Sequence, residues 1–308
     1  MIVWILLLLA SLGLLYKVSE IVEKELVKFA EYSGITHLAV GFIFLAVVTS
    51  LPELSISISS TFLKNQEISP GVSIGNVLYD LLLILPIVSI WYGLKVDEGN
   101  FRKIKQLSLI SLLSLFPITI LKSIERIYGL ALVISFIILS RYLLQEKAKK
   151  QVQSTKEERF RNKMVLAFSL ISLSFLSFLI NLSTKKISEA TKISSFLIGS
   201  IIVSIATSSS EFFACLAAGK RKNYGIVIGT IYGTLVFDTM FVVGSTSLLA
   251  PITFSNVNQF LFLYCFLFVS LISIILMLVR KKEIGIDSSV FLLMLFALWI
   301  FLSILIGI

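Results

Sequence analysis

The chain of 308 residues is 57% hydrophobic and 15% charged, with a mean hydropathy of +0.97. This composition excludes an ordinary soluble domain, and apolar runs of about 20 residues indicate a polytopic helical membrane protein in a lipid bilayer. The formal net charge of +9 does not indicate a nucleic-acid partner, because the basic residues lie in short connections between apolar runs. The two cysteines, Cys215 and Cys265, lie within apolar runs and indicate neither a disulfide framework nor a zinc site.

Apolar segments in chain order predict an all-α protein with ten transmembrane helices. Residues 1–145 hold five of them and residues 164–308 hold the other five, on either side of a basic loop at 146–163. The mixed-charge stretch from Lys17 to Ser33 predicts an interfacial helix or loop after the first span. The predicted spans are 2–18, 35–63, 69–92, 104–121, 127–145, 164–182, 193–218, 224–250, 258–279 and 287–307.

Basic residues are distributed unequally between the two sides that these spans define. Connections 1–2, 3–4, 5–6, 7–8 and 9–10 together carry 21 of the 27 Lys and Arg residues, and the opposite side carries 6. Cytoplasmic connections are enriched in Lys and Arg. The distribution therefore predicts a cytoplasmic central loop and two outside termini, in a protein of the cell membrane.

Two sequence motifs occur once in each half. Residues 48–53 (VTSLPE) and 73–80 (SIGNVLYD) return as residues 206–211 (ATSSSE) and 227–238 (VIGTIYGTLVFD). Because each half has an odd number of spans, the two copies must lie in opposite orientations. Inverted repeats of this kind are typical of secondary transporters, which bind substrate near the midplane where the repeats meet.

Four carboxylic acids lie within the predicted spans: Glu53, Asp80, Glu211 and Asp238. A charge at the centre of a bilayer costs about 3 kcal/mol or more, so each acid needs a compensating partner. The spans contain no suitably placed Lys or Arg, since the basic residues cluster in the connections. We therefore expect protons or bound metal cations to supply the counter-charge.

The repeat motifs supply only oxygen ligands, which hard cations such as Ca²⁺ and Na⁺ prefer. No suitably placed His or Cys pair favours a softer metal. We expect no cofactor, but a site for transported Ca²⁺ and Na⁺, or for H⁺. The candidate metal-binding residues are Thr49, Ser50, Glu53, Asp80, Thr207, Ser208, Glu211, Thr234 and Asp238.

The motifs resemble the alpha repeats of the sodium/calcium exchanger family, in the cation/calcium antiporter superfamily. The family pattern is roughly G-T-S-x-P-E followed by G-N-x-x-G-S-N-x-x-N/D. This resemblance implies an antiporter, not an enzyme, that exchanges Ca²⁺ against Na⁺ by alternating access. It implies that Glu53 and Glu211 are the principal Ca²⁺ ligands, assisted by the carbonyls of Thr49 and Thr207. It also implies that spans 1 and 6 slide past a core of spans 2, 3, 7 and 8.

The chain departs from that pattern, as a divergent member of the family would. Val48 and Ala206 replace the glycine before each Thr-Ser pair, and Ser210 replaces the second proline. Asp80 replaces a serine, and Ile84 replaces the closing asparagine of the first motif. With four acids in one site, like-charge repulsion would keep at least one of them protonated. The departures therefore leave the driving ion open between Na⁺ and H⁺.

Three alternatives remain. One keeps the fold and exchanges Ca²⁺, or another divalent cation, against H⁺. An intramembrane aspartyl protease is suggested by the Tyr79-Asp80 pair, but Asp238 lacks the expected Gly-x-Gly-Asp context and both glutamates stay unexplained. The third is a cation sensor that has lost transport. No oligomeric state follows from the sequence.

Overall fold

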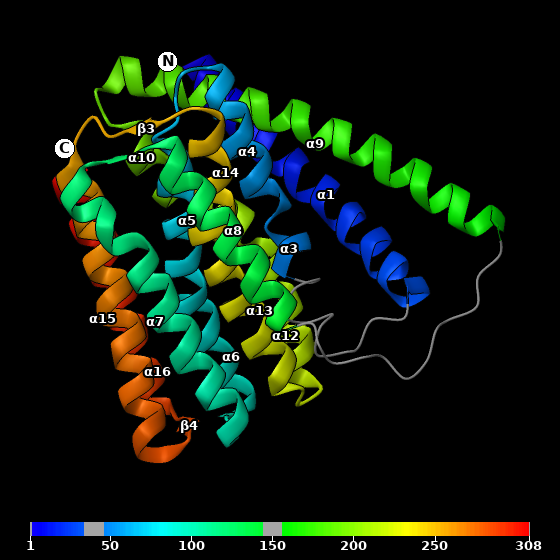
Figure 1. Ribbon diagram of the computed structural model, residues 1–308, viewed down its shortest axis with the longest axis vertical. Coiled ribbons are helices and arrows are strands. Elements are labelled where there is room, and N and C mark those ends of the chain that lie inside the picture. The colour runs from blue at the N-terminus through cyan, green and yellow to red at the C-terminus, as the bar shows by residue number, and fades with distance from the viewer. Residues whose placement is uncertain (1, 34–45, 144–155, 308) are drawn as a thin grey trace.

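The computed structural model describes residues 2–33, 46–143 and 156–307, which form a bundle of helices (Figure 1). Residues 35–45 of the second predicted span and residues 146–155 of the predicted central loop lie outside the described residues. The first half contains α1 (Ile2–Ser33), α3 (Ala46–Thr49), α4 (Leu51–Phe62), α5 (Ile68–Tyr79), the π-helical turn η2 (Asp80–Ile84), α6 (Leu85–Tyr92), β1 (Leu94–Lys95), α7 (Glu98–Leu121), β2 (Ser123–Ile124) and α8 (Arg126–Leu143).

The second half has the same order of elements, with α10 and η3 in addition. It contains α9 (Lys156–Thr191), α10 (Ser195–Ile198), the π-helical turn η3 (Gly199–Val203), α11 (Ser204–Thr207), α12 (Ser209–Lys220), α13 (Tyr224–Val236), the π-helical turn η4 (Phe237–Val242), α14 (Val243–Leu249), β3 (Ile252–Thr253), α15 (Val257–Lys281), β4 (Glu283–Ile284) and α16 (Ile286–Gly307).

Several helices are long and apolar enough to cross a membrane. In the described part of the chain five qualify, and a sixth span results if Ser195–Thr207 and Glu211–Lys220, bent by 46°, count as one. The predicted class, a multi-span helical membrane protein, is thus confirmed, while the number ten stays a prediction. The five are Ile68–Tyr92, Glu98–Leu121, Tyr224–Leu249, Val257–Lys281 and Ile286–Leu305.

Helices α1 and α9 are longer than the predicted spans. The mixed-charge stretch after the first span continues α1 to Ser33, and α9 begins at Lys156, inside the predicted loop. Glu and Lys are good helix formers, so a helix can continue beyond the apolar segment. The two helices pack against each other (Figure 1). Leu8 and Leu12 of α1 share a buried cluster with Ile180 of α9.

Two short antiparallel strand pairs join the halves at opposite ends of the bundle. β1 pairs with β4, and β2 pairs with β3. β1 precedes α7 and β2 follows it, so the two pairs are separated by the length of that helix. Each pair combines a connection from one half with a connection from the other. The two strand pairs therefore fasten the halves to each other at both ends of the bundle.

Each half also has a helix break and a π-helical turn at equivalent positions. Ser50 separates α3 from α4, and Ser208 separates α11 from α12. In the π-helical turns, the carbonyls of Asp80 and Asp238 accept hydrogen bonds from the N–H groups of Leu85 and Val243, five residues later. Such π-turns in α-helices occur frequently at functional sites.

The first half packs closely on the second where α5 crosses η3 and α11. A Cβ atom added to Gly75 would lie 2.4 Å from both the Ser200 carbonyl oxygen and Ser204 Oγ. A Cβ on Gly71 would lie 2.3 Å from the Phe196 carbonyl oxygen. Small residues permit this approach of one helix backbone to another inside a membrane. The contact brings the motifs of the two halves together.

Candidate functional site

The nine predicted site residues come from six places in the fold and are all buried. Thr49, Ser50 and Glu53 lie at the α3–α4 break. Asp80 begins η2, and the second half supplies the remaining five residues from equivalent positions. Those five are Thr207 and Ser208 at the α11–α12 break, Glu211 in α12, Thr234 in α13 and Asp238 in η4.

Glu211 accepts hydrogen bonds from both halves of the chain. Its Oε1 atom accepts from Thr234 Oγ1 at 3.1 Å and from Ser50 Oγ at 3.4 Å. Asn76 Nδ2 donates to the same oxygen at 3.5 Å. The hydroxyl of Thr49 also lies beside this carboxylate. The acid of the second motif is therefore positioned largely by residues of the first.

Asn76 connects the polar groups at the centre of the cluster. Its Nδ2 atom also donates to Asp238 Oδ2 at 3.0 Å, and its Oδ1 atom accepts a hydrogen bond from Ser208. Sequence reasoning did not select Asn76 as a site residue. The sequence did contain a signal for it: Asn76 lies four residues before Asp80, and residues i and i+4 share one helix face, so the amide would lie on the same side as the acid.

Glu53 occupies the corresponding position in the first motif. The Thr207 hydroxyl of the second half lies beside its carboxylate, as Thr49 lies beside Glu211. Each glutamate is thus approached by the threonine of the opposite motif. The reciprocal arrangement indicates that the two motifs form one site and not two.

The cluster contains more carboxylate oxygens than the hydrogen-bond donors around it satisfy. Among the described residues, six buried carboxylate oxygens have no hydrogen-bond partner: both of Glu53, both of Asp80, Glu211 Oε2 and Asp238 Oδ1. Glu53 lies close enough to Glu211 and Asp238 for repulsion, and Asp80 is repelled by the other three. No Lys or Arg is found among the described buried residues. Buried polar groups normally have partners, so this cluster is suited to binding something positively charged.

The types of ligand atom in the cluster fit a hard cation, but the acidic side chains lie too far apart for three of them to hold one ion together. Carboxylate, hydroxyl and amide oxygens are ligands that Ca²⁺ and Na⁺ accept. No three His, Cys, Asp or Glu side chains of the described residues are grouped at metal-binding distances. A bound cation would therefore draw on the hydroxyl oxygens of Ser50 and Thr234, or on small shifts of the acidic side chains.

Comparison with known proteins gives a family match over most of the chain. The family model described as "Sodium/calcium exchanger protein" matches residues 3–145 and again residues 163–305. The chain is also similar to curated archaeal proteins. It is 27% identical over 240 residues to the uncharacterized membrane protein MJ0091 of Methanocaldococcus jannaschii, covering 75% of this chain and 77% of that protein. It is 32% identical over 115 residues to the sodium/calcium exchanger MaX1 of Methanosarcina acetivorans, covering 37% of this chain and 33% of that protein.

The fold is similar to solved structures of the sodium-calcium exchanger NCX_Mj. One of these, from a crystal soaked with 2.5 mM Na⁺ and 0.1 mM Ca²⁺, superposes with a TM-score of 0.66 at 25% sequence identity. The match covers 97% of this chain and 98% of that chain. The similarity therefore extends over both repeats and the connections between their helices.

Proposed function

The chain belongs to the sodium/calcium exchanger protein family, and from this premise we propose that it is a secondary antiporter that exchanges Ca²⁺ against Na⁺. The resemblance expected from the repeat motifs is confirmed by the family match. That family consists of exchangers, so the protease alternative gains no support. The protein is an integral membrane protein that belongs with cation transporters.

The observation that carries this proposal is the buried acidic cluster shared by both halves. Its six unpartnered carboxylate oxygens need positive charge, and no described basic residue is buried with them. Ca²⁺ and Na⁺ would each balance negative charge on the same acids, so the two ions compete for the site. Competition of this kind couples the movement of the two ions. The site can turn from one side of the membrane to the other readily only when bound cations neutralise its charge in the low-dielectric interior.

We place ten helices in the bilayer as two inverted five-helix repeats, residues 1–145 and 164–308, joined by the basic loop 146–163. Both termini lie outside and the loop is cytoplasmic, in the cell membrane. The strand pairing supports this arrangement, because β1 and β4 belong to connections with many basic residues. In alternating access, α1 and α9 slide along the core that holds the cluster. Their packing against each other supports a movement as a pair.

The test is ⁴⁵Ca²⁺ uptake by purified protein in proteoliposomes. An outward Na⁺ gradient at equal pH on both sides should drive uptake well above the level seen without a gradient. Replacing internal Na⁺ by choline should abolish it. Binding of Ca²⁺ without flux under any gradient would contradict the proposal and would favour the cation sensor.

Exchange of Ca²⁺ against H⁺ is the second candidate, and Asp80 favours it. Asp80 adds a fourth acid whose two oxygens have no hydrogen-bond partner among the described residues. Uptake driven by a pH gradient alone, without Na⁺, would support this candidate. If H⁺ is the driving ion, Asp80→Asn should reduce pH-driven uptake. Na⁺-driven exchange, by contrast, should proceed without any pH gradient across the membrane.

A further inference from the structure

A cleft of about 580 Å³ opens at the end of the bundle where β1 pairs with β4. Three connections meet around it: the one between α6 and α7, the one between α12 and α13, and the one between α15 and α16. The backbone joins the first of these connections to the third, since the Val96 N–H donates to the Lys282 carbonyl at 3.0 Å. The cleft shares no residue with the acidic cluster.

The lining of the cleft is basic. It includes Lys95, Lys222, Lys281 and Lys282, against the acids Asp97 and Glu283, so its net charge is +2. Asp97 is engaged in capping α7, where it accepts from the backbone N–H of Asn100. Lys282 forms an ion pair with Glu98.

The other three lysines are exposed, and no described residue forms an ion pair with them. Lys222 follows the end of α12 and has a φ of +56°, a left-handed backbone conformation that is uncommon for lysine.

The start of α13 adds to the positive potential. Asn223, which precedes this helix, makes no side-chain capping hydrogen bond, and Gly225 in the first turn lines the cleft. The first N–H groups of a helix carry partial positive charge and bind anions, phosphate in particular. Unpaired lysines and an uncapped helix start therefore face the same space.

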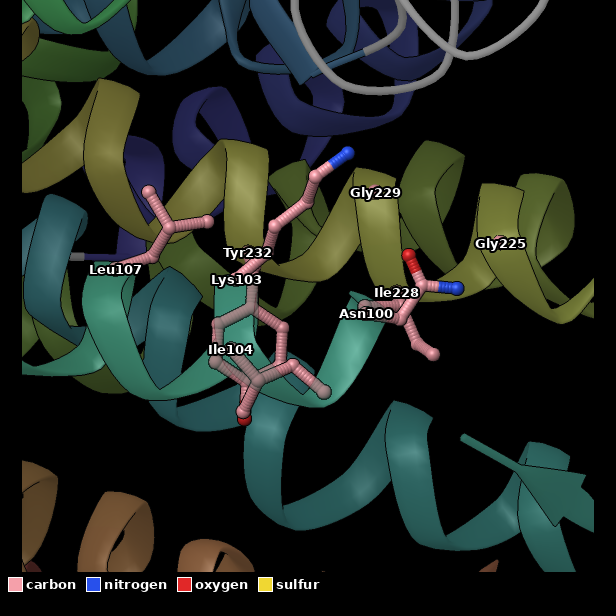
Figure 2. A pocket seen from close by; sticks show the side chains of 8 residues that line it. All are labelled: Asn100, Lys103, Ile104, Leu107, Gly225, Ile228, Gly229 and Tyr232. Atoms are coloured by element: carbon pink, nitrogen blue, oxygen red, sulfur yellow. The ribbon is translucent and has the colours of Figure 1, made fainter. Parts of the chain in front are cut away.

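The surroundings of the cleft indicate a lipid and not a free anion. Trp91, at the end of α6, is 61% exposed, and Ile286, at the start of α16, is 66% exposed. Exposed tryptophan beside lysine is typical of the level of lipid headgroups. Figure 2 shows a narrow groove between α7 and α13 that shares Asn100 and Gly225 with the cleft and adds Lys103. With a volume of about 20 Å³, this groove admits no acyl chain.

We propose that this lysine cleft binds the phosphate headgroup of an anionic phospholipid, whose acyl chains stay outside the protein among the bilayer lipids. The site goes beyond the exchange function, because it shares no residue with the acidic cluster and would bind an anion instead of a cation. Basic pockets between transmembrane helices commonly bind anionic headgroups. The lipid would hold together three connections that come from both halves of the chain.

The test is a lipid titration of purified full-length protein in neutral detergent, read by native mass spectrometry. Phosphatidylglycerol should bind with a defined stoichiometry, and phosphatidylcholine should bind much more weakly. The triple variant Lys95→Gln, Lys222→Gln and Lys281→Gln should weaken phosphatidylglycerol binding on the order of a hundredfold.

The control variant Arg102→Gln, Lys105→Gln and Lys220→Gln removes the same charge from exposed residues that do not line the cleft. It should leave phosphatidylglycerol binding within about twofold of the parent protein. If the triple cleft variant fails to fold, each single substitution should still weaken binding by roughly fivefold.

Unchanged phosphatidylglycerol affinity in the cleft variants would overturn the proposal. Inorganic phosphate that displaces the lipid at equal concentration would overturn it too, because the cleft would then recognise a free anion. Neither outcome depends on Ca²⁺ flux, so the result is independent of the proposed exchange activity.

Discussion

A single amide, Asn76, bridges two carboxylates that come from the other half of the chain. It donates to Glu211 at 3.5 Å and to Asp238 at 3.0 Å, and it accepts from Ser208. Each donor to a buried carboxylate lowers the cost of its charge. The residue therefore positions two acids of the cluster relative to each other.

Substitution of Asn76 by Ala tests this role. Loss of the amide leaves Asp238 Oδ2 without its donor, and an unsatisfied buried polar group costs about 1–3 kcal/mol. We expect ⁴⁵Ca²⁺ uptake in proteoliposomes to fall about tenfold, since 1.4 kcal/mol corresponds to a factor of ten.

The matched control is Asn65→Ala, because Asn65 is also buried but its Nδ2 atom has no partner among the described residues. Uptake by the control should stay near that of the parent protein. An Asn76→Ala protein with undiminished uptake would show that the amide does not organise the site.

At the level of single residues, the repeat motifs predicted which side chains would meet. All nine predicted residues are buried. Hydrogen bonds link five of them through Glu211 and Asn76: Ser50, Ser208, Glu211, Thr234 and Asp238. Asn76 was missed because an uncharged amide in an apolar run gives no electrostatic signal. Its importance depends on partners 132 to 162 residues away, which only the fold brings close.

Helix breaks and π-turns place these side chains, and local sequence explains them only in part. Pro86 lacks an N–H and its ring excludes the carbonyl four residues earlier, which accounts for the altered winding of η2. In the second half Gly244 stands at the equivalent place after Asp238, and η4 has the same winding without a proline. Packing between the halves must therefore stabilise η4, and sequence alone does not predict it.

The crossing of α5 over η3 and α11 sets the distance between the two motifs. In Gly75→Ala, the new Cβ would lie 2.4 Å from backbone and side-chain oxygens of the second half, which must move. Overpacking of this kind costs about 1–3 kcal/mol. We expect a lower thermal unfolding midpoint in detergent and reduced Ca²⁺ uptake.

The control for this substitution is Gly13→Ala in α1, where the new Cβ has no other element of the described chain within 4 Å. Alanine is the better helix former, so the control should be neutral or slightly stabilising. Equal unfolding midpoints for the two variants would show that the close crossing does not limit stability.

The whole molecule combines a compact core with the helix pair α1 and α9 at its side (Figure 1). The predicted multi-span character and the two matching halves followed from apolar runs and repeated motifs. The lengths of α1 and α9 could not be predicted from the sequence, because hydropathy identifies the apolar part of a helix and not its charged continuation. Helix α9 contacts the core through Asn181, which donates to the Ile56 carbonyl at 2.7 Å and to Ser59 of α4.

A crosslink between α9 and α4 tests whether this helix pair must move. In a Cys265→Ser background, Ser59→Cys combined with Asn181→Cys should form a disulfide, since the two native side chains are hydrogen-bonded. We expect oxidation to stop Ca²⁺ flux while Ca²⁺ binding persists, and reductant to restore flux. Undiminished flux in the fully crosslinked protein would refute sliding of α9 along α4.

The proposal that both halves build one cation site is tested most directly by equilibrium binding of ⁴⁵Ca²⁺ to the purified protein. Glu53→Gln and Glu211→Gln each remove one charge from the cluster, and loss of a charged ligand costs about 1.5–3 kcal/mol. Each should weaken Ca²⁺ binding by roughly tenfold to a hundredfold, and Na⁺ should displace Ca²⁺ from the parent protein. The exposed control Glu125→Gln should bind as the parent does. Parent-like Ca²⁺ affinity in both Glu53→Gln and Glu211→Gln would contradict the shared site.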